Sequence, residues 1–400
     1  MFERVYLDNA ATTRLDPAVL KEMMPFLTDD YGNASSIHSF GQTARAAVDK
    51  ARHRVAGLLN ARPAEIVLTS GGTESNNLAI RGLVESIRRK HSDHKNERPH
   101  LIISAIEHPA VKMVCDDLAG ADCEITVVTV DETGVVDHRR VTDSIRENTV
   151  LVSIMAVNNE IGTIQPIAEI GRSVRSLRDS GQRIWFHTDA VQAVGKMSVD
   201  VEELGCDLLS LSGHKIHGPK GIGALYVRRG VRLHPQNIGG RQERGNRGGT
   251  EPVSQIVGLG AAAETASSSL IETSYRLRTL RDGFEDRVLE TIPEAYLNGD
   301  RHGRVPNISN ISFRGIEGEG LLINLDMQGF AVSTGAACSS GSIEPSPVII
   351  ALGRDDELAR GAIRFSFSRF TSNDEVERLL TALPRSVETL RSLSAGLARK

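Results

Sequence analysis

The sequence contains few cysteines, few aromatic residues and no long hydrophobic run. Only four of its 400 residues are cysteine, and their spacing fits neither a disulfide framework nor a zinc site, so we expect a reducing, cytoplasmic setting. No apolar run is long enough to span a bilayer, and the first residues lack the hydrophobic stretch of a signal peptide. A membrane protein and a secreted, disulfide-stapled protein are therefore disfavoured.

The chain also has little excess charge of either sign. Its 47 basic and 51 acidic residues give a net charge of −4, which argues against nucleic acid as a partner. The basic cluster between residues 88 and 98 is better interpreted as a solvated helix end and loop. With 40% apolar and 24% charged residues, the composition is that of a globular protein, and 400 residues predict two domains.

Strand-like runs alternate with helical patterns over the first two thirds of the chain. This alternation predicts an α/β fold in which a mostly parallel, seven-stranded sheet is flanked by helices. The candidate strands are 65–69, 101–105, 124–130, 150–156, 183–188, 207–211 and 223–227. The helical patterns among them include 42–59, 109–118 and 166–179.

After Thr250 the pattern changes. One long helical segment, about 252–289, leads into a smaller α+β section. Its candidate strands are 308–313 and 362–367, and its candidate helices are 317–327 and 373–395. Because the first dozen residues are too short to fold alone, we expect them to pack across this section. The predicted domains are a large one, 13–265, and a small one that combines 1–12 with 266–400.

Two buried strands end in groups of opposite charge. One ends in Ser212-Gly213-His214-Lys215, where burial favours the neutral, nucleophilic amine of Lys215. The other ends in Asp189. An amine that forms a Schiff base and a carboxylate that pairs with a pyridinium nitrogen are what pyridoxal phosphate (PLP) requires. A structural salt bridge that caps both strands is the alternative.

Two glycine-rich segments are candidate phosphate sites. Residues 70–77 follow a strand and open a helix, whose unpaired N–H groups attract phosphate. A plain tight turn is the alternative, but beside a PLP site Gly72 and Thr73 become a phosphate cradle, with Ser212 and His214 as further donors. The second segment, 245–250, ends in Thr250, which in a dimer could reach the neighbouring subunit's phosphate.

Three further polar residues follow strand ends, where ligands of open α/β sheets collect. His108 could stack on a pyridine ring and move protons, although an ordinary loop histidine is equally compatible with the sequence. Asn159 could donate an amide to the cofactor. Gln192 lies one helical turn beyond Asp189 and could bond the phenolic oxygen of the ring.

Cys338 and Arg364 are unusual in their surroundings. Cys338 lies among small residues from 333 to 342, so we expect an exposed loop and a thiol that reacts. The other three cysteines have helix or strand contexts typical of buried hydrophobes. Arg364 lies within an apolar strand and must meet a carboxylate there, either a structural glutamate or the α-carboxylate of a substrate.

Taken together, these segments resemble the NifS/IscS-type cysteine desulfurases, which are class-V aminotransferases with the fold of type I PLP enzymes. The resemblance covers nearly the whole chain, in the expected order. It runs through 6–13, 33–36, 70–77, 107–108, 158–162, 187–192, 212–215, the loop of Cys338, and 364–366. The sequence departs from the family pattern at Ala34, where proline is usual, at Arg241, where glycine is usual, and at Gly249, where serine or alanine is commoner.

The resemblance implies a role for each candidate residue. Lys215 would bond the cofactor's aldehyde, His108 would stack on the ring, and Cys338 would be the nucleophile. Asp189 would pair with the ring nitrogen, and Asn159 and Gln192 would bond the ring. The phosphate would be held by Gly72, Thr73, Ser212 and His214, with Thr250 from the partner subunit. Arg364, helped by Asn33, would bind the substrate carboxylate.

The implied activity is the removal of sulfur from L-cysteine, which gives L-alanine and a persulfide on Cys338. An acceptor protein would take the sulfur for iron–sulfur cluster assembly or tRNA thiolation. The resemblance further implies a homodimer without a resident metal, although Cys338 could transiently ligate an iron–sulfur cluster held by a scaffold partner. The alternatives are a selenocysteine lyase or aminotransferase on the same fold, and a non-catalytic protein that docks sulfur scaffolds. Cys338 favours the desulfurase over an aminotransferase, because transamination needs no thiol.

Overall fold

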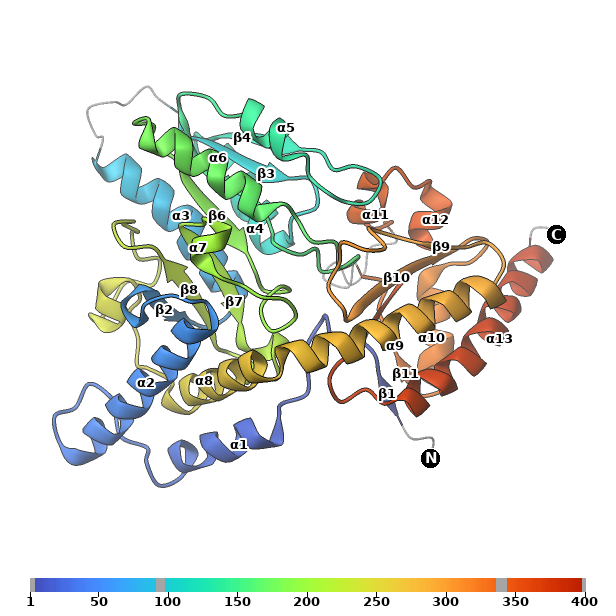
Figure 1. Ribbon diagram of the computed structural model, residues 1–400, viewed down its shortest axis with the longest axis horizontal. Helices are drawn as coiled ribbons and strands as arrows, with labels where there is room; N and C mark the ends of the chain where they lie inside the picture. Colours follow the sequence, from blue (N-terminus) through green and yellow to red (C-terminus); the bar gives the residue numbers. More distant parts are fainter. Residues whose placement is uncertain (1–3, 91–97, 336–343, 398–400) are drawn as a thin grey trace.

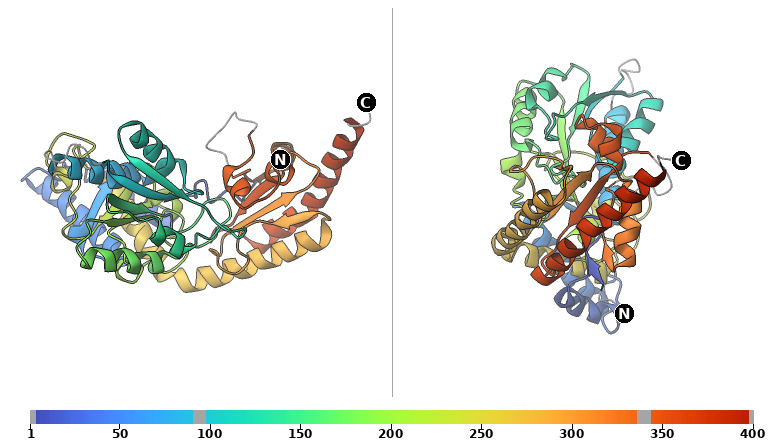
Figure 2. Two further views of the ribbon diagram at one scale, coloured as in Figure 1. Left: turned by 90° about the horizontal axis from the view of Figure 1, so that it is seen from above. Right: turned by 90° about the vertical axis from the view of Figure 1, so that its right-hand side faces the viewer.

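The computed structural model describes residues 4–90, 98–335 and 344–397, which form two lobes (Figure 1). The larger lobe holds a central sheet with helices on both sides, and the smaller one holds a second sheet. Helices α8 (Val253–Ser268) and α9 (Leu270–Thr291) connect the lobes along one side, as Figure 2 shows.

The large sheet has seven strands in the order β2-β8-β7-β6-β5-β3-β4. Only β8 runs antiparallel to its neighbours, β2 and β7, so the predicted mostly parallel seven-stranded sheet is confirmed. The strands are β2 (Ile66–Thr69), β3 (His100–Ser104), β4 (Glu124–Val128), β5 (Thr149–Ser153), β6 (Trp185–Asp189), β7 (Leu208–Ser212) and β8 (Gly223–Val227).

Both faces of this sheet are buried except at its edge strand β4, which explains why most of its strands are nearly continuous apolar runs. Successive side chains of a strand point to opposite faces. In β3, Leu101 and Ile103 pack with residues of α3 (Gly72–Lys90) and α4 (Pro109–Gly120), whereas Ile102 joins the core on the other face. The other elements of this lobe are α1 (Pro17–Met23), η1 (Met24–Leu27), α2 (Ser39–Leu58), η2 (Pro63–Glu65), α5 (His138–Asp143), α6 (Ile167–Asp179), α7 (Val201–Leu204), η3 (Gly213–Lys215) and η4 (Gln242–Gly245).

The smaller lobe has a hydrophobic core of its own. The rings of Phe365 and Phe367 lie 4.9 Å and 5.6 Å from that of Phe284, between centroids. Its antiparallel sheet has the order β12-β10-β9. The elements are β9 (Ala295–Leu297), β10 (Ile308–Phe313), α10 (Gly318–Met327), β11 (Phe330–Ala331), α11 (Pro347–Ala351), α12 (Asp356–Arg360), β12 (Ala362–Ser366) and α13 (Asn373–Leu397).

The N-terminal segment crosses from one lobe to the other. Strand β1 (Val5–Tyr6) pairs in parallel with β11, and the Ser366 N–H donates to the Leu7 carbonyl at 2.7 Å. The chain then continues into α1 of the large lobe. Residues 9–13 therefore lie between the two lobes, where they contact the candidate site.

The prediction of one long helix over 252–289 is wrong, because α8 and α9 meet at Ser269. The hydroxyls of Ser268 and Ser269 both donate to the Thr265 carbonyl, at 3.2 Å and 2.8 Å. Such side-chain bonds compete with the backbone ladder and interrupt a helix. A run of three serines, 267–269, is therefore the local cause of the break.

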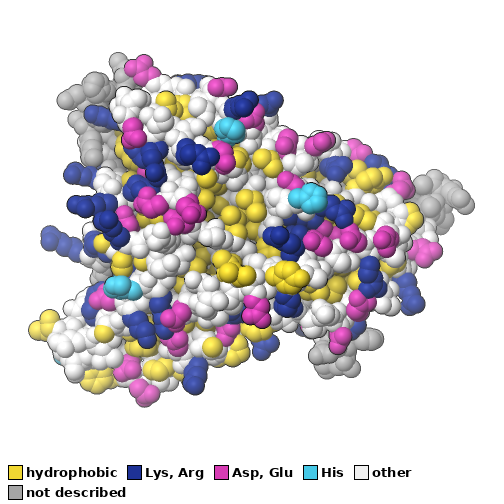
Figure 3. All heavy atoms as spheres, viewed as in Figure 1, with side chains coloured by type: hydrophobic (Ala, Val, Ile, Leu, Met, Phe, Trp, Pro, Cys, Tyr) yellow, Lys and Arg dark blue, Asp and Glu magenta, His cyan; other side chains and the backbone are white. Residues whose placement is uncertain are grey.

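On the face seen in Figure 1, positive and negative side chains alternate without a large field of one sign (Figure 3). Among the helices that the structure describes, none has both the length and the hydrophobicity that crossing a bilayer requires.

Candidate active site

The candidate residues converge at the carboxyl edge of the parallel strands. Strand β6 ends at Asp189 and its neighbour β7 ends at Ser212, followed at once by Lys215 in η3. His108 follows β3, two strands away in the same sheet. This edge is where open α/β sheets bind their ligands.

Asp189 is buried, and two donors hold its carboxylate in place. The side-chain amide of Asn76 donates to Oδ2 at 2.7 Å, and the Val191 N–H donates to Oδ1 at 3.0 Å. Asn76 was not among the predicted site residues. It lies four residues after Gly72 in α3, on the same helix face, and that spacing is the signal that points to it.

The amine of Lys215 contacts the N-terminal segment. Its Nζ donates to the carbonyls of Ala10 and Ala11, at 2.6 Å and 2.7 Å. The side chain of Gln192 donates to the same Ala10 carbonyl at 2.9 Å, while its buried Oε1 has no partner. Ala10 therefore brings Lys215 and Gln192 together, although the two lie on different strand ends.

A buried lysine, Lys196, lies next to the half-buried Lys215. The Nζ of Lys196 donates to the Lys215 carbonyl at 3.2 Å, and both residues line a cavity of about 40 Å³. Burial, with the nearby charge of Lys215, lowers the pKa of Lys196 to about 7. Lys196 was not among the predicted site residues.

The predicted phosphate cradle is assembled beside Ser212. A Cβ on Gly72 would lie 2.8 Å from Cγ2 of Val191, and one on Gly71 would lie 3.8 Å from Oγ of Ser212. The glycines therefore keep the start of α3 open next to Ser212, while Thr73 is exposed in the first turn.

His214 lies on the same side, where its Nδ1 is hydrogen-bonded to Thr12 Oγ1 at 3.1 Å. Burial, together with Lys215 and Lys220, lowers the pKa of His214 to about 4. At neutral pH the ring is therefore uncharged and contributes only an N–H.

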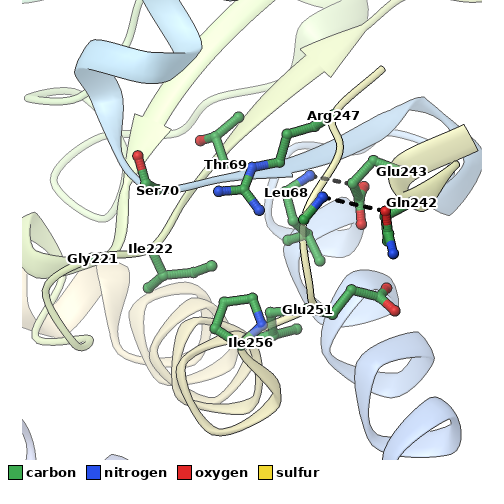
Figure 4. A pocket seen from close by; sticks show the side chains of 12 residues that line it. Leu68, Thr69, Ser70, Gly221, Ile222, Gln242, Glu243, Arg247, Glu251 and Ile256 are labelled. Carbon is green, nitrogen blue, oxygen red and sulfur yellow. Dashed lines mark hydrogen bonds between the residues drawn. The ribbon is translucent and has the colours of Figure 1, made fainter. Parts of the chain in front are cut away.

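The segment that carries Thr250 is tied to the first turn of α3. Arg247 Nε donates to Glu74 Oε1 at 2.8 Å, and Glu74 Oε2 accepts the Ser70 N–H at 2.7 Å. Arg247 and Ser70 line the small pocket in Figure 4, together with Glu243, whose carboxylate accepts the Leu68 N–H at 2.9 Å. Thr250 itself is exposed, and no described contact joins it to the cradle of its own chain.

His108 opens helix α4. Its Nδ1 accepts the Ala110 N–H at 3.1 Å, so in the neutral ring the proton lies on Nε2. Burial lowers the pKa of His108, and the charges of Asp189 and Lys215 act on it in opposite directions. The ring is therefore close to both predicted cofactor residues.

Glu107 is buried next to this histidine. Its Oε1 accepts from Ser104 Oγ at 2.5 Å and from the Met155 N–H at 2.9 Å, whereas Oε2 is buried without a partner. Burial raises the pKa of Glu107 to about 8, and the charge of Asp189 acts in the same direction. Glu107 is thus an uncharged acid at neutral pH.

Arg364 is buried in β12 and meets a carboxylate, but not the glutamate that we considered. Its Nη2 donates to Asp8 Oδ1 at 2.7 Å, and Nη1 donates to the Asn159 carbonyl at 2.9 Å. Nε is buried and has no partner. Asn33 does not join this group: it is exposed in the segment between η1 and α2, where its Oδ1 accepts the Ser35 N–H at 2.9 Å.

The predicted nucleophile Cys338 lies outside the described residues. The other three cysteines are buried, which confirms the prediction for Cys115, Cys123 and Cys206. Burial raises the pKa of both Cys115 and Cys206 to about 12, so neither is a thiolate at neutral pH. None of these three has the exposure that a reactive thiol needs.

Comparison with known proteins decides the family. The family model "Aminotransferase class-V" matches residues 5–379. The cysteine desulfurase IscS of Dictyoglomus turgidum is 46% identical over 98% of this chain and 97% of that relative. A cysteine desulfurase of Nostoc sp. is 47% identical over 98% of this chain and 94% of its own length. The chain belongs to the cysteine desulfurases of the class-V aminotransferase family.

Solved structures of related proteins have the same architecture. A NifS-like protein superposes with a TM-score of 0.88 at 36% identity and covers 97% of this chain and 100% of its own. A structure described as "SspA in complex with cysteine" gives a TM-score of 0.80 at 36% identity over 92% of this chain and 100% of its own. The fold predicted from the resemblance to cysteine desulfurases is thereby confirmed.

Cysteine desulfurases are PLP-dependent, and the residues of this chain fit that cofactor. The site offers an amine in Lys215 and a fixed, buried carboxylate in Asp189. The start of α3 offers unpaired N–H groups beside Ser212. The buried, unpartnered Oε1 of Gln192 indicates a polar group that the protein alone does not satisfy.

Proposed function

We propose that this protein removes sulfur from L-cysteine, releases L-alanine and keeps the sulfur as a persulfide on Cys338. The observation that carries the proposal is the convergence of Lys215, Asp189 and His108 at one sheet edge, facing the buried Arg364 of the smaller lobe. An aminotransferase would share the first three residues, but Cys338 has no use in that reaction.

PLP, when bound, supplies an electron sink that makes the bonds around the substrate Cα easier to break. Lys215 would hold it, Asp189 would pair with the ring nitrogen, and His108 would stack on the ring. Gly72, Thr73, Ser212 and His214 would bind the phosphate, with Asn159 and Gln192 bonding the ring. Because Asn76 and Val191 fix both oxygens of Asp189, the carboxylate needs no rearrangement when it acts.

Arg364 would orient the substrate. The guanidinium is already held by Asp8 and by the Asn159 carbonyl, so little side-chain entropy is lost when a carboxylate binds. A planar guanidinium binds a carboxylate through two parallel hydrogen bonds, which also fixes the direction of the substrate's side chain. Asn33 would assist from the partner subunit, since in its own chain it is exposed and has no described contact with Arg364.

His108 would handle the proton of the substrate thiol. In the neutral ring Nδ1 accepts the Ala110 N–H and Nε2 carries the proton, so taking up the thiol proton at Nε2 requires that Nδ1 release this cap and receive the ring proton. The lowered pKa of His108 keeps the ring neutral at physiological pH, so one of its two nitrogens is without a proton.

Cys338 would receive the sulfur. Its thiolate forms the new S–S bond as the Cβ–S bond of cysteine breaks, and the electron pair of that bond stays with the carbon fragment. A proton then completes the methyl group of alanine. One thiol and one cysteine become one persulfide and one alanine, so no external oxidant or reductant is needed.

The assembly and the acceptor are also proposals. The exposed Thr250 supports a homodimer in which it reaches the phosphate of the neighbouring site. The sulfur would pass to an iron–sulfur scaffold or another acceptor protein, for cluster assembly or tRNA thiolation, in the cytoplasm. The division of the chain near residue 265, just before the break at Ser269, belongs to the same set of proposals.

Mass spectrometry tests the central claim. After incubation with L-cysteine, the peptide that contains Cys338 should carry one additional sulfur atom, and alanine should accumulate. Cys338→Ala should abolish both while it keeps the visible absorbance of the bound cofactor. Cys115→Ala, a change at a buried cysteine, is the matched control and should retain activity. Undiminished alanine formation by Cys338→Ala would refute the desulfurase assignment, and a colourless wild-type protein would favour a docking protein.

A further inference from the structure

The turn after β5 connects the two lobes at the active site. Asn158 Oδ1 accepts the N–H groups of Glu160 and Ile161, at 2.8 Å and 3.0 Å, which shapes a tight turn. From the smaller lobe, the Asn310 side chain donates to the Glu160 carbonyl at 3.2 Å. Arg364 donates to the carbonyl of the preceding residue, Asn159. The turn is therefore fixed from both lobes.

The side chain of Glu160 is buried in the smaller lobe, with 5% of the residue exposed. Its Oε2 accepts a hydrogen bond from Ser346 Oγ at 2.6 Å. The same hydroxyl accepts the Ile349 N–H at 3.3 Å as the cap of α11. Ser346 is thus the point at which the chain enters α11, and Glu160 holds that point.

Glu160 also contacts the chain at Gly335. A Cβ on Gly335 would lie 2.7 Å from Oε2 of Glu160, so only a glycine allows the carboxylate this close. The φ of Gly335 is +85°, which independently favours glycine. Just before it, Ser333 pairs with Arg364 through two backbone hydrogen bonds, of 2.7 Å and 3.2 Å.

Gly335 and Ser346 flank Cys338 in the sequence. Cys338 comes three residues after Gly335 and eight before Ser346. Because a chain extends by at most about 3.6 Å per residue, a fixed Gly335 limits the distance that the thiol can reach. One oxygen atom of Glu160 is therefore in contact with both ends of the segment that carries the proposed nucleophile.

A carboxylate is a costly residue for a purely structural contact at this position. Burial raises the pKa of Glu160, while the Ser346 hydroxyl and the charge of Arg364 oppose the rise. Burying a polar side chain costs free energy of folding unless the side chain is hydrogen-bonded or paired with an opposite charge. Its partners here are the proposed substrate clamp and the flanks of the Cys338 segment.

We propose that Glu160 is a positioning residue for sulfur transfer, which sets the position of the Cys338 segment relative to the substrate held by Arg364. This inference rests on the proposed function. Glu160 touches no reacting atom. It acts through Gly335 and Ser346, and it belongs to the same turn that holds Arg364. The same turn would therefore position both the substrate-binding Arg364 and the segment of Cys338.

The test separates substrate binding from sulfur transfer in the full-length, PLP-loaded protein. Glu160→Ala removes the acceptor for Ser346 and should slow the single-turnover formation of the Cys338 persulfide by about a hundredfold, since a misplacement of about 1 Å has effects of that size. The spectral change on adding L-cysteine, which reports binding and the first chemical steps, should keep its wild-type rate and half-saturating concentration. Glu160→Gln retains an acceptor oxygen and should restore most of the transfer rate.

Ser346→Ala provides the matched variant on the other side of the contact. It should slow transfer in the same way, and the double variant with Glu160→Ala should be no slower than the slower single variant, because both changes remove one interaction. Wild-type transfer rates in Glu160→Ala, or additive effects in the double variant, would overturn the inference. A loss of cofactor binding as large as the loss of sulfur transfer would also overturn the inference, because it would mean that Glu160 only supports the structure of the site. Absence of the Cys338 persulfide in the unchanged protein would instead refute the proposed function.

Discussion

Replacing Glu107 with glutamine should stabilise the protein relative to wild type, and this difference should grow as the pH rises. The pKa of Glu107 is about 8 in the folded protein, against an ordinary value of 4.5. For an acid whose pKa is raised by folding, the folded state binds more protons than the unfolded state between those two values. Its contribution to stability is complete below about pH 4.5 and is lost progressively until about pH 8.

The size of the effect follows from that difference. Each pKa unit corresponds to about 1.4 kcal/mol, so between about pH 5 and pH 8 the wild-type protein should lose up to about 4 kcal/mol relative to Glu107→Gln. Glutamine keeps an oxygen for Ser104 and Met155 and places an uncharged amide at the partnerless Oε2 position. The two proteins should thus be similar near pH 5 and diverge above it.

Melting temperatures measured across this pH range, with and without the substitution, provide the assay. Glu272→Gln, on the exposed surface of α9, is the control and should change the stability by no more than about 0.5 kcal/mol. Parallel pH profiles for wild type and Glu107→Gln would refute the reasoning, because they would mean that Glu107 is ionised at no cost in the folded protein.

Further substitutions at three residues test the site. Asp189→Asn turns an amide N–H toward the donor of Asn76 or Val191, so it should lower the free energy of unfolding by about 1–3 kcal/mol. It should also lower kcat by about a hundredfold or more, and an undiminished kcat would contradict the role of the carboxylate. Arg364→Lys cannot bind a carboxylate in a bidentate manner, so KM for L-cysteine should rise about tenfold to a hundredfold with a smaller change in kcat; a change confined to kcat would argue against the clamp. His108→Asn preserves a side-chain acceptor for the Ala110 N–H and should lose about a hundredfold in kcat at nearly unchanged stability, whereas His108→Ala should also lose about 1 kcal/mol with the helix cap. Equal stabilities of the two His108 variants would show that the cap is unimportant.

The sequence predicts the central sheet well because its strands are buried on both faces and read as continuous apolar runs. The residues at their ends, such as Asp189 and Lys215, could be identified because a charged group at the end of a buried strand costs free energy unless it has a partner or a ligand. The pattern also required a carboxylate for Arg364. It could not identify Asp8, because the two residues are 356 positions apart and meet only when the chain returns to its N-terminus.

Other features depend on tertiary burial, which no local pattern reveals. Glu107 and Glu160 are acidic residues next to polar residues in the sequence, His108 and Asn159, and acidic residues are usually exposed. Their burial comes from segments that pack over them from elsewhere in the chain. The break at Ser269 was missed for a different reason: the helical period continues through it, and only the serine hydroxyls interrupt the backbone ladder.

The N-terminal segment has a consequence for biosynthesis. The Ala10 carbonyl accepts a hydrogen bond from Lys215, and the Leu7 carbonyl accepts the N–H of Ser366, which the ribosome adds long after residues 5–11. A nascent chain can fold the central sheet much earlier, but residues 5–11 have no place to dock until β11 and β12 have been made. Completion of the candidate site is therefore delayed until β12 has been made, so chains that end before Ser366 would lack a competent site.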